Sequence, residues 1–542
     1  MCEHLRVSID ANNANHLPRA AGVLIPLFSL RTGGDLGWGE IRDLVPFVDF
    51  ALAMRHRVVQ LLPLGETSPG EASPYSALSV FAIDPLYISL NGVEGISAAE
   101  IDQARATIGS PRTKRRRRVR DAKLSLLRQS FHHFVERAGP EQRAELDSFA
   151  ELNRGWLHDY ALFRALKERM NWRSWEKWPE GLKSRDAATL AAVRSELAEP
   201  IRMYTYWQFV AHRQWAEARA AAAARGALLG GDLSFSPARD SAEVWANQQL
   251  FKLDRSVGAP PDGFNPKGQR WGLPMPDWER MRSDGFAWWR DRIRHERSLY
   301  DVFRIDHVVG LYRTFSFGPD PDQPGEYWPA SPEEQREQGE AFMRMVKDEA
   351  RGAPVIAEDL GAVPAWVRES LTAFGIPGYK VMRWEKEKKV PSDAGDAKEA
   401  GDADHAEERF VSPADYPELS VATTGTHDTE TFVQWWREIG EDERRNLAES
   451  LSLDGRLDPL RPSLADAELE AILEKLYQSP ARLVVVPIQD LFGWETRINL
   501  PGTVQDSNWA FRLPAPLERL SRKASIRARQ VDLSAIVERT GR

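Results

Sequence analysis

Short apolar segments that alternate with helical segments constrain the fold of this chain more than any other feature. Residues 22–26 and 58–62 are each predicted to form a short strand. Between them, residues 41–54 place apolar side chains at the spacing of one helix face. A strand, a helix and a second strand in this order form a βαβ unit, in which the strands are parallel and the crossover is right-handed.

The same alternation continues along the rest of the chain. The eight predicted strands lie near residues 23, 58, 229, 303, 356, 380, 422 and 484. Eight strands with intervening helices are typical of a (β/α)8 TIM barrel, an α/β fold whose sheet closes on itself. Periodicity alone leaves an open α/β sheet as the alternative.

We expect residues 1–542 to form a single barrel domain with large helical insertions and no separate C-terminal β-domain. Residues 97–198 are strongly charged and helical in pattern, so we expect a helix-rich insertion there. Residues 385–409 are polar and rich in Asp and Gly, which favours a flexible surface loop. The basic run at residues 114–118 is interpreted as a solvated face, because the rest of the chain is acidic.

Composition argues against several classes of protein. The net charge of −8 argues against a general nucleic-acid binder, which needs a basic face. The single cysteine, Cys2, forms no intramolecular disulfide and fits a reducing compartment. The first twenty residues show no signal peptide, and no apolar run approaches the roughly 20 residues of a membrane span. We therefore expect a cytoplasmic protein, a monomer or weak homo-oligomer, that binds neither nucleic acid nor membrane.

Three acidic residues follow predicted strands. Asp306 follows the strand near residue 303, Glu358 follows the strand near 356, and Asp428 lies shortly after the strand near 422. Carboxylates at the carboxyl ends of successive barrel strands meet at one rim. Most enzymes that break glycosidic bonds use two facing carboxylates as their catalytic groups. Each acid alone is compatible with an ion pair or a helix cap, but three at the same kind of strand end favour a shared site.

The surroundings of two of these acids indicate different roles. Arg304 stands two residues before Asp306, so both side chains point to the same face of a strand. A guanidinium beside an aspartate favours the ionised form that a nucleophile requires. Glu358 follows an apolar strand, where the pKa of a glutamate can rise so that it serves as an acid.

The same segments resemble the active-site segments of the amylomaltases, which are 4-α-glucanotransferases of glycoside hydrolase family 77 in the α-amylase clan. The matching segments are residues 304–307, 357–361 and 424–429, together with 62–67, 73–76, 231–233, 240–245, 268–272, 495–503 and 508–509. The resemblance therefore spans roughly residues 22 to 514.

The resemblance implies a retaining double displacement. Asp306 would be the nucleophile, Glu358 the acid and base, and Asp428 the residue that binds sugar hydroxyls and stabilises the transition state. It also implies a set of substrate-binding residues, namely Ser73, Tyr75, Asp232, Trp271, Arg304 and His427. The expected donors are maltooligosaccharides, amylose or glycogen, and the expected acceptors are glucans or glucose. No cofactor and no metal are expected.

Two points stay open at the level of sequence. The loop at residues 260–278, which contains Trp271, is expected to cover the acceptor cleft and exclude water. An α-1,4-glucan hydrolase of the same clan and a catalytically silent glucan-binding protein remain alternatives. The segments 232–236, 410–417 and 429–431 depart from the family pattern, which leaves the preferred substrate length open.

Overall fold

Eight parallel strands form the largest sheet of the computed structural model, which describes residues 17–109, 115–261, 266–320, 322–388 and 408–542. Their order is β10-β13-β14-β1-β2-β3-β6-β9, and each neighbouring pair is parallel. The strands are β1 (Ala20–Leu24), β2 (His56–Gln60), β3 (Leu228–Leu233), β6 (Val302–Ile305), β9 (Val355–Ala357), β10 (Gly378–Val381), β13 (Ser420–Thr423) and β14 (Leu483–Pro487). Every predicted strand position lies in one of them.

The two edge strands, β9 and β10, close the sheet into a barrel. The main-chain N–H of Ala357 donates to the carbonyl of Pro377 at 2.9 Å. The N–H of Tyr379 donates to the Asp359 carboxylate at 2.7 Å, and Arg368 holds the other oxygen of that carboxylate at 3.0 Å. The predicted (β/α)8 barrel is therefore confirmed, and the open-sheet alternative is wrong.

The strands of the barrel are buried on both faces, which explains their composition. All five residues of β14 are buried, as expected for a parallel strand covered by helices outside and by side chains inside. The interior is narrow beside β3. A Cβ atom on Gly231 would lie 2.2 Å from the ring of Tyr300, and one on Gly230 would lie 2.5 Å from the Gln60 amide. Glycine is therefore required there, and Asp232 follows directly at the carboxyl end.

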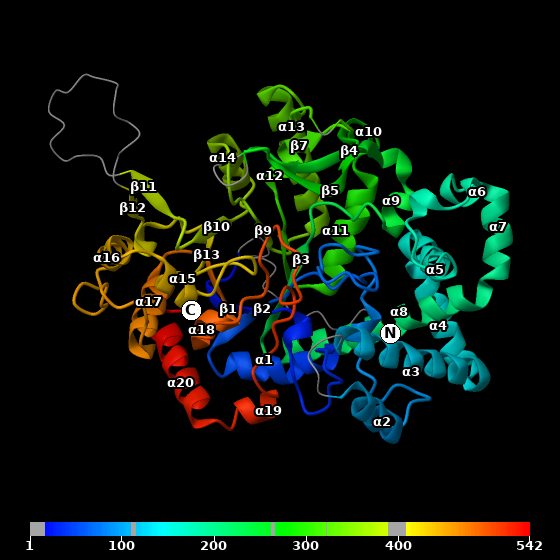
Figure 1. The fold of residues 1–542 in the computed structure, drawn as a ribbon, viewed down its shortest axis with the longest axis horizontal. Coiled ribbons are helices and arrows are strands. Elements are labelled where there is room, and N and C mark those ends of the chain that lie inside the picture. Colours follow the sequence, from blue (N-terminus) through cyan, green and yellow to red (C-terminus); the bar gives the residue numbers. More distant parts are fainter. Residues whose placement is uncertain (1–16, 110–114, 262–265, 321, 389–407) are drawn as a thin grey trace.

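Helices surround the barrel on the outside (Figure 1). They include α1 (Leu44–Leu52), α8 (Ala198–Ala224), α11 (Ala287–Leu299), α13 (Pro332–Ala350), α14 (Ala365–Ala373), α15 (Phe432–Glu438), α16 (Glu441–Ser450) and α17 (Asp466–Gln478). After β14 the chain forms α18 (Ile488–Phe492), α19 (Leu517–Leu520) and α20 (Ala524–Arg539), with no strand in that part of the described chain. None of the described helices is both long and apolar enough to span a bilayer.

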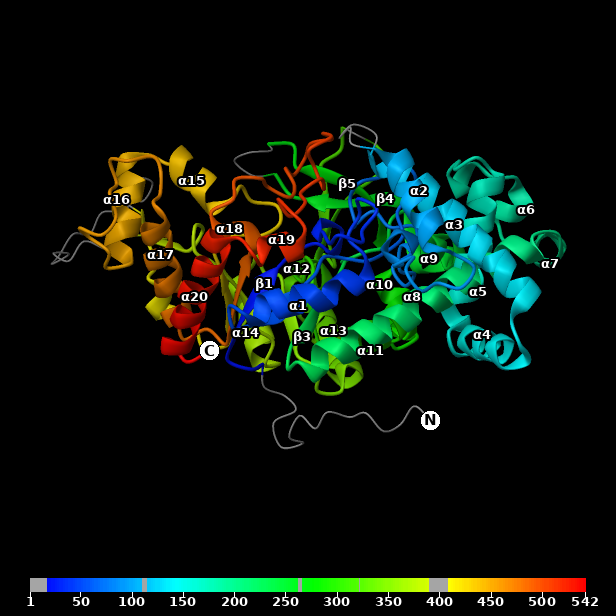
Figure 2. The same cartoon turned by 90° about the horizontal axis from the view of Figure 1, so that it is seen from below.

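The connection between β2 and β3 contains most of the additional helices. They are α2 (Ala98–Ile108), α3 (Arg115–Arg137), α4 (Pro140–Leu152), α5 (Arg154–Arg169), α6 (Glu180–Lys183) and α7 (Ala187–Glu196). A capping box between Ser97 and Glu100 starts α2, and Gly226, with φ of 76°, follows α8 as a terminating residue. Figures 1 and 2 both show α3 to α7 on one side of the barrel and α16, α17 and α20 on the other.

A second, antiparallel sheet lies beside the barrel in the order β5-β4-β7-β8. Its strands are β4 (Phe251–Ala259), β5 (Gln269–Pro276), β7 (Thr314–Phe317) and β8 (Glu326–Trp328). Much of the segment expected to be a loop at residues 260–278 is thus strand β5, paired with β4; residues 262–265 lie outside the described residues. Of the expected surface loop at 385–409, the ends pair as β11 (Lys386–Lys388) and β12 (Glu408–Phe410), and residues 389–407 lie outside the described residues.

One face of α3 carries basic side chains inward. The interpretation of the basic run as a solvated face holds for Arg117, which is exposed, but not for Arg116. The Arg116 guanidinium donates to the Thr67 hydroxyl at 2.7 Å and lies over the Trp38 ring at 5.1 Å. Helical spacing places Lys123 on the same face, two turns farther along.

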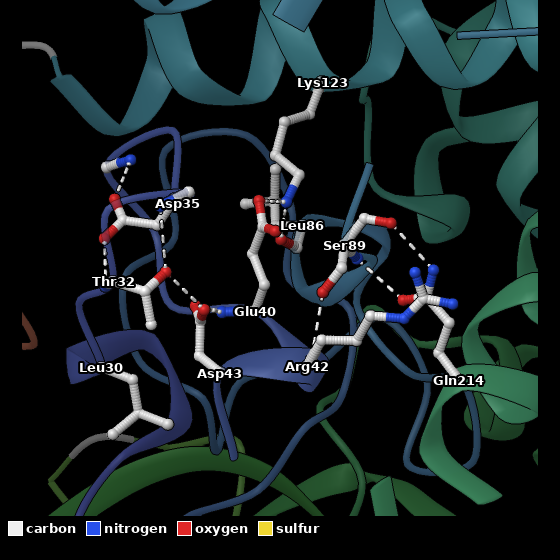
Figure 3. Close-up of polar contacts among 12 residues, drawn as sticks. Leu30, Thr32, Asp35, Glu40, Arg42, Asp43, Leu86, Ser89, Lys123 and Gln214 are labelled. Atoms are coloured by element: carbon white, nitrogen blue, oxygen red, sulfur yellow. Dashed lines mark hydrogen bonds and ion pairs between the residues drawn. The ribbon is translucent and has the colours of Figure 1, made fainter. Parts of the chain in front are cut away.

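Lys123 reaches from α3 into the loop that follows β1 (Figure 3). Its ammonium group pairs with the Glu40 carboxylate at 2.7 Å and donates to the carbonyl of Leu86 at 2.7 Å. Both side chains of the ion pair are buried, at 0% and 6% exposure. Burial raises the pKa of Glu40 to about 7, although the charge of Lys123 opposes this rise.

The variant Lys123→Met should lower the free energy of unfolding by about 3 kcal/mol or more at about pH 8, because Glu40 is left charged and buried without a partner. At about pH 6 the loss should be smaller, because the folded pKa of Glu40 is raised and the group already carries a proton there. Urea unfolding at the two pH values measures both losses. The second change Glu40→Gln should recover stability in the double variant.

Arg117→Met provides the matched control on the same helix. Arg117 is exposed and lies 3.8 Å from the exposed carboxylate of Asp121, so its loss should change stability little at either pH. Equal losses for Lys123→Met at the two pH values would contradict the assigned role of Glu40.

Candidate active site

Four acidic side chains meet at the carboxyl ends of the barrel strands. Asp232 lies in β3, Asp306 follows β6, Glu358 follows β9, and Asp428 lies in the turn after β13. The barrel ladder continues into two of them: Asp306 N–H donates to Leu233, and Glu358 N–H donates to Ile305, each at 2.9 Å. This is the rim at which barrel enzymes place their catalytic groups.

Arg304 joins three of these acids. It is the register partner of Asp232 on the neighbouring strand, so both side chains point the same way. One guanidinium nitrogen lies 2.6 Å from the Asp232 carboxylate. The other lies 2.8 Å from Asp306 and 3.9 Å from Glu358. The planar guanidinium stays charged, so its ion pair fixes the position of the Asp306 carboxylate.

Glu358 is held by main-chain donors in a buried position. The N–H of His307 donates to one carboxylate oxygen at 2.8 Å, and the N–H of Leu360 donates to the other at 2.9 Å. Burial raises the pKa of Glu358 to about 7; Arg304 opposes the rise, and the negative charge of Asp306 adds to it. Glu358 therefore exchanges a proton near neutral pH, as an acid and base must.

Asp428 has the opposite electrostatic environment. His427 lies 3.3 Å from one oxygen, and the Asn499 amide donates to the other at 2.7 Å. Burial would raise the pKa of Asp428, but the charge and hydrogen bond of His427 and the bond from Asn499 outweigh it and lower the pKa to about 2. The Asp428 side chain is 41% exposed, compared with 11% for Glu358, so it is an open, ionised carboxylate.

Polar contacts beneath the turn orient Asp428. The Thr424 hydroxyl donates to the buried carboxylate of Asp490 at 2.5 Å. Arg383 donates to the Thr424 carbonyl at 2.8 Å, and the N–H of Thr426 donates to the Thr429 hydroxyl at 3.1 Å. These hydrogen bonds fix the main chain of the turn that carries Asp428.

Tyr75 connects the loop after β2 to this cluster. Its hydroxyl donates to Asp232 at 2.7 Å, and its ring stacks on His427 with centroids 5.2 Å apart. Ser73 lies farther back: its hydroxyl oxygen accepts the N–H of Tyr75 at 3.3 Å. The structure thus brings Tyr75, Asp232, Arg304 and His427 together, whereas the described contact of Ser73 orients the turn that carries Tyr75.

Trp271 approaches the cluster from strand β5. Its side chain is 37% exposed, and its ring meets the ring of His307 edge to face with centroids 4.8 Å apart. His307 directly follows Asp306 in the sequence. Trp271 is therefore connected to the acid cluster through its contact with His307.

Three residues near Asp428 were absent from the predicted site. Asn499 donates to the Asp428 side chain, Arg497 donates to the Asp428 carbonyl at 2.7 Å, and the Trp509 ring lies 5.8 Å from that of His427. Sequence comparison marked the segments that contain them, but 71 residues separate Asn499 from Asp428. Nothing local in the sequence indicates this contact.

The arrangement places Asp306, which is paired with a guanidinium, beside Glu358, whose pKa is raised to about 7. The Asp306 and Glu358 oxygens approach the same guanidinium nitrogen at 2.8 and 3.9 Å. Their separation cannot exceed the sum of those distances, which excludes most of the roughly 6.5–9.5 Å range of inverting glycosidases. Within the described residues, no group of three or more His, Cys, Asp or Glu side chains is arranged to hold a metal ion.

Comparisons with known proteins give a consistent result. The sequence model of the 4-alpha-glucanotransferase family, glycoside hydrolase family 77, matches residues 25–518. The chain is 33% identical over 518 residues to a 4-alpha-glucanotransferase of Thermus thermophilus, with 92% of this chain and 95% of that protein covered. It is 30% identical over 515 residues to one of Chlamydia pneumoniae, with 92% of each covered. An amylomaltase from Streptococcus agalactiae, solved with acarbose, superposes with a TM-score of 0.80 at 27% identity, with 97% of this chain and 99% of that chain covered.

Proposed function

The chain belongs to the 4-alpha-glucanotransferases of glycoside hydrolase family 77, and we propose that Asp306, Glu358 and Asp428 carry out its reaction by a retaining double displacement. The enzyme transfers segments of α-1,4-glucan from a donor to the 4-hydroxyl of an acceptor. The hydrolase and binding-protein alternatives are not favoured by relatives that are named glucanotransferases.

The contact of Arg304 with both Asp306 and Glu358 carries the mechanistic proposal. Because one nitrogen lies within 3.9 Å of both carboxylates, the upper limit on their separation includes the roughly 5–5.5 Å typical of retaining enzymes. In a retaining enzyme the second carboxylate reaches the anomeric carbon itself and needs no intervening water. Asp306 is therefore the nucleophile, and Glu358 is the acid and base.

The first step cleaves the donor. A carboxylate oxygen of Asp306 forms a bond to the anomeric carbon while the bond from that carbon to the glycosidic oxygen breaks. The proton of Glu358 passes to the leaving oxygen, so the donor fragment departs as a neutral sugar with a free 4-hydroxyl. A glycosyl ester on Asp306 remains, and Glu358 is now a carboxylate.

The second step transfers the glycosyl group. Glu358 accepts the proton of the acceptor 4-hydroxyl, whose oxygen bonds to the anomeric carbon as the ester to Asp306 breaks. The ionised form of Asp428 accepts hydrogen bonds from hydroxyls of the same sugar and offsets the positive charge that develops on its ring. Tyr75, which stacks on His427, offers a flat aromatic surface beside that sugar.

We propose maltooligosaccharides, amylose or glycogen as donors and glucose or a glucan as the acceptor. The complex of a related amylomaltase with acarbose supports a sugar in the corresponding cleft. Trp271 is proposed to border the acceptor position, which its exposed ring and its contact with His307 support. The buried pair of Lys123 and Glu40 supports treating the inserted helices as part of the same catalytic domain.

Incubation with maltotriose should yield glucose together with maltooligosaccharides longer than the substrate. Chromatography over a time course measures both products. Each transfer of a maltosyl unit releases one glucose for each chain that grows, and each transfer of a glucosyl unit releases one maltose. Glucose and maltose without longer chains would show a hydrolase instead.

Asp306→Asn should lower transfer by at least about 10⁴-fold, because the amide cannot form the glycosyl ester. Glu358→Gln should lower transfer from maltotriose strongly but retain much of the first step with a donor whose leaving group needs no proton, such as a maltosyl fluoride. The initial burst of fluoride release measures the first step in Glu358→Gln, and the rate of transfer from maltotriose gives the comparison. Full activity of the first variant, or no recovery by fluoride in the second, would contradict the assigned roles.

Activity on maltotriose should fall as the pH rises through about 7, because Glu358 then loses the proton that the leaving group needs. The pKa of Glu358 is raised, so its protonated and active form lies on the acid side of this value. The dependence of kcat/KM on pH from about pH 5 to about pH 9 measures this fall, which is the alkaline limb of the profile. With a maltosyl fluoride the same profile should lose this limb; an identical limb with both donors would assign it to another group.

A further inference from the structure

His307 occupies an uncommon backbone conformation directly after the nucleophile. Its φ is 46°, in the left-handed region, where a side chain with a Cβ atom is strained. This conformation turns the N–H of His307 toward Glu358, to which it donates at 2.8 Å. A second main-chain hydrogen bond joins the same two segments: the N–H of Val308 donates to the Glu358 carbonyl at 3.0 Å.

The His307 ring is held between two aromatic residues. It meets Trp271 of strand β5 edge to face at 4.8 Å and Phe235, in the loop after β3, at 5.4 Å. Gly310 leaves the space for this packing, since a Cβ there would lie 2.6 Å from Phe235 and 2.7 Å from the His307 ring. Burial lowers the pKa of His307 to about 4, so the ring is neutral at working pH.

One residue therefore has two separate contacts with functional groups. Its main chain binds the carboxylate that takes the proton of the incoming hydroxyl. Its side chain packs edge to face against the exposed indole of Trp271, with ring centroids 4.8 Å apart. The main-chain N–H binds a carboxylate oxygen of the proposed acid and base, and the family resemblance assigned His307 no role.

We propose that His307 is a positioning residue that couples Trp271 to Glu358, and that this coupling favours a sugar over water as the acceptor. The inference rests on the proposed function. A flat aromatic surface at a set position beside the base binds a sugar ring and offers nothing to water. If Trp271 and Glu358 shift relative to each other, a bound acceptor hydroxyl no longer meets the base, whereas a small water molecule still does.

The test is a double-mutant cycle of Trp271→Ala and His307→Gly. Glycine adopts φ of 46° without strain, so His307→Gly keeps the main-chain bond to Glu358 and removes only the ring. Trp271 is exposed, so its replacement leaves the core intact. The readout is the ratio of transfer to hydrolysis with maltotriose, from the free reducing ends and the longer chains formed.

Each single variant should lower the transfer-to-hydrolysis ratio by roughly three- to tenfold, as expected for the loss of one aromatic contact. The double variant should lower it no further than the stronger single variant, because both remove the same contact. The coupling would be overturned if the double variant lowered the ratio by the product of the two single effects. It would also be overturned if His307→Gly left the ratio unchanged. Ser452→Gly, at an exposed left-handed residue with φ of 51° far from the site, is the matched control and should leave the ratio unchanged.

His307→Ala separates the main-chain contact from the ring contact. Alanine has the same Cβ strain as histidine at this φ but lacks the ring that packs against Trp271 and Phe235 and holds the turn, so the N–H should move away from Glu358. Around Glu358, Arg304 and the N–H groups of His307 and Leu360 favour the carboxylate, and Asp306 disfavours it. Loss of one donor should move the alkaline limb on maltotriose to higher pH in His307→Ala but not in His307→Gly.

A residue that only fills space would move the limb in neither variant, which would overturn the main-chain part of the inference. The wild-type products keep the two hypotheses apart. A wild-type enzyme that only hydrolyses maltotriose refutes the transferase mechanism and the inference with it. A wild-type enzyme that transfers, but whose two variants act independently, refutes the inference alone.

Discussion

The buried guanidinium of Arg304 is the interaction on which the rest of the site depends. It lies within 4 Å of the carboxylates of Asp232, Asp306 and Glu358, and its side chain is 8% exposed. Three carboxylates in so small a volume would repel one another and take up protons without a positive charge among them. Arg304 pairs with Asp306 and holds it in place, and Glu358, whose pKa is raised to about 7, is the group that retains a proton near neutrality.

The chemistry follows from the contrast between the environments of two acids. Glu358 is buried beside a second negative charge, which raises its pKa to about 7. Asp428 accepts bonds from His427 and Asn499, which outweigh burial and lower its pKa to about 2. The same chemical group therefore serves as a proton donor at one position and as a permanent anion at the other, as in other enzymes that tune paired acids by environment.

The inserted helices support the site from outside the barrel. Glu66, in the loop that leads to Tyr75, is fully buried and accepts hydrogen bonds from Arg164 at 2.8 Å, Arg120 at 3.2 Å and the Tyr160 hydroxyl at 2.5 Å. Arg120 belongs to α3, and the other two donors belong to α5. A loop that presents a substrate-binding ring needs such bracing, because positions on loops are otherwise less precise than positions on strands.

The amino-acid sequence by itself determined the eight strands, their order along the chain and the three acids that follow them, because apolar periodicity and the position of a polar residue after a strand are local properties. It also indicated the helical insertion and the family. Only the tertiary structure decided that Arg304 contacts Asp232 and Glu358 as well as its sequence neighbour Asp306, and that Asn499 binds Asp428. It also decided that Arg116, from a run expected in solvent, and Lys123, farther along the same helix, point inward. These contacts join residues far apart along the chain, and they depend on barrel closure and on which helix face is buried, which local spacing does not encode.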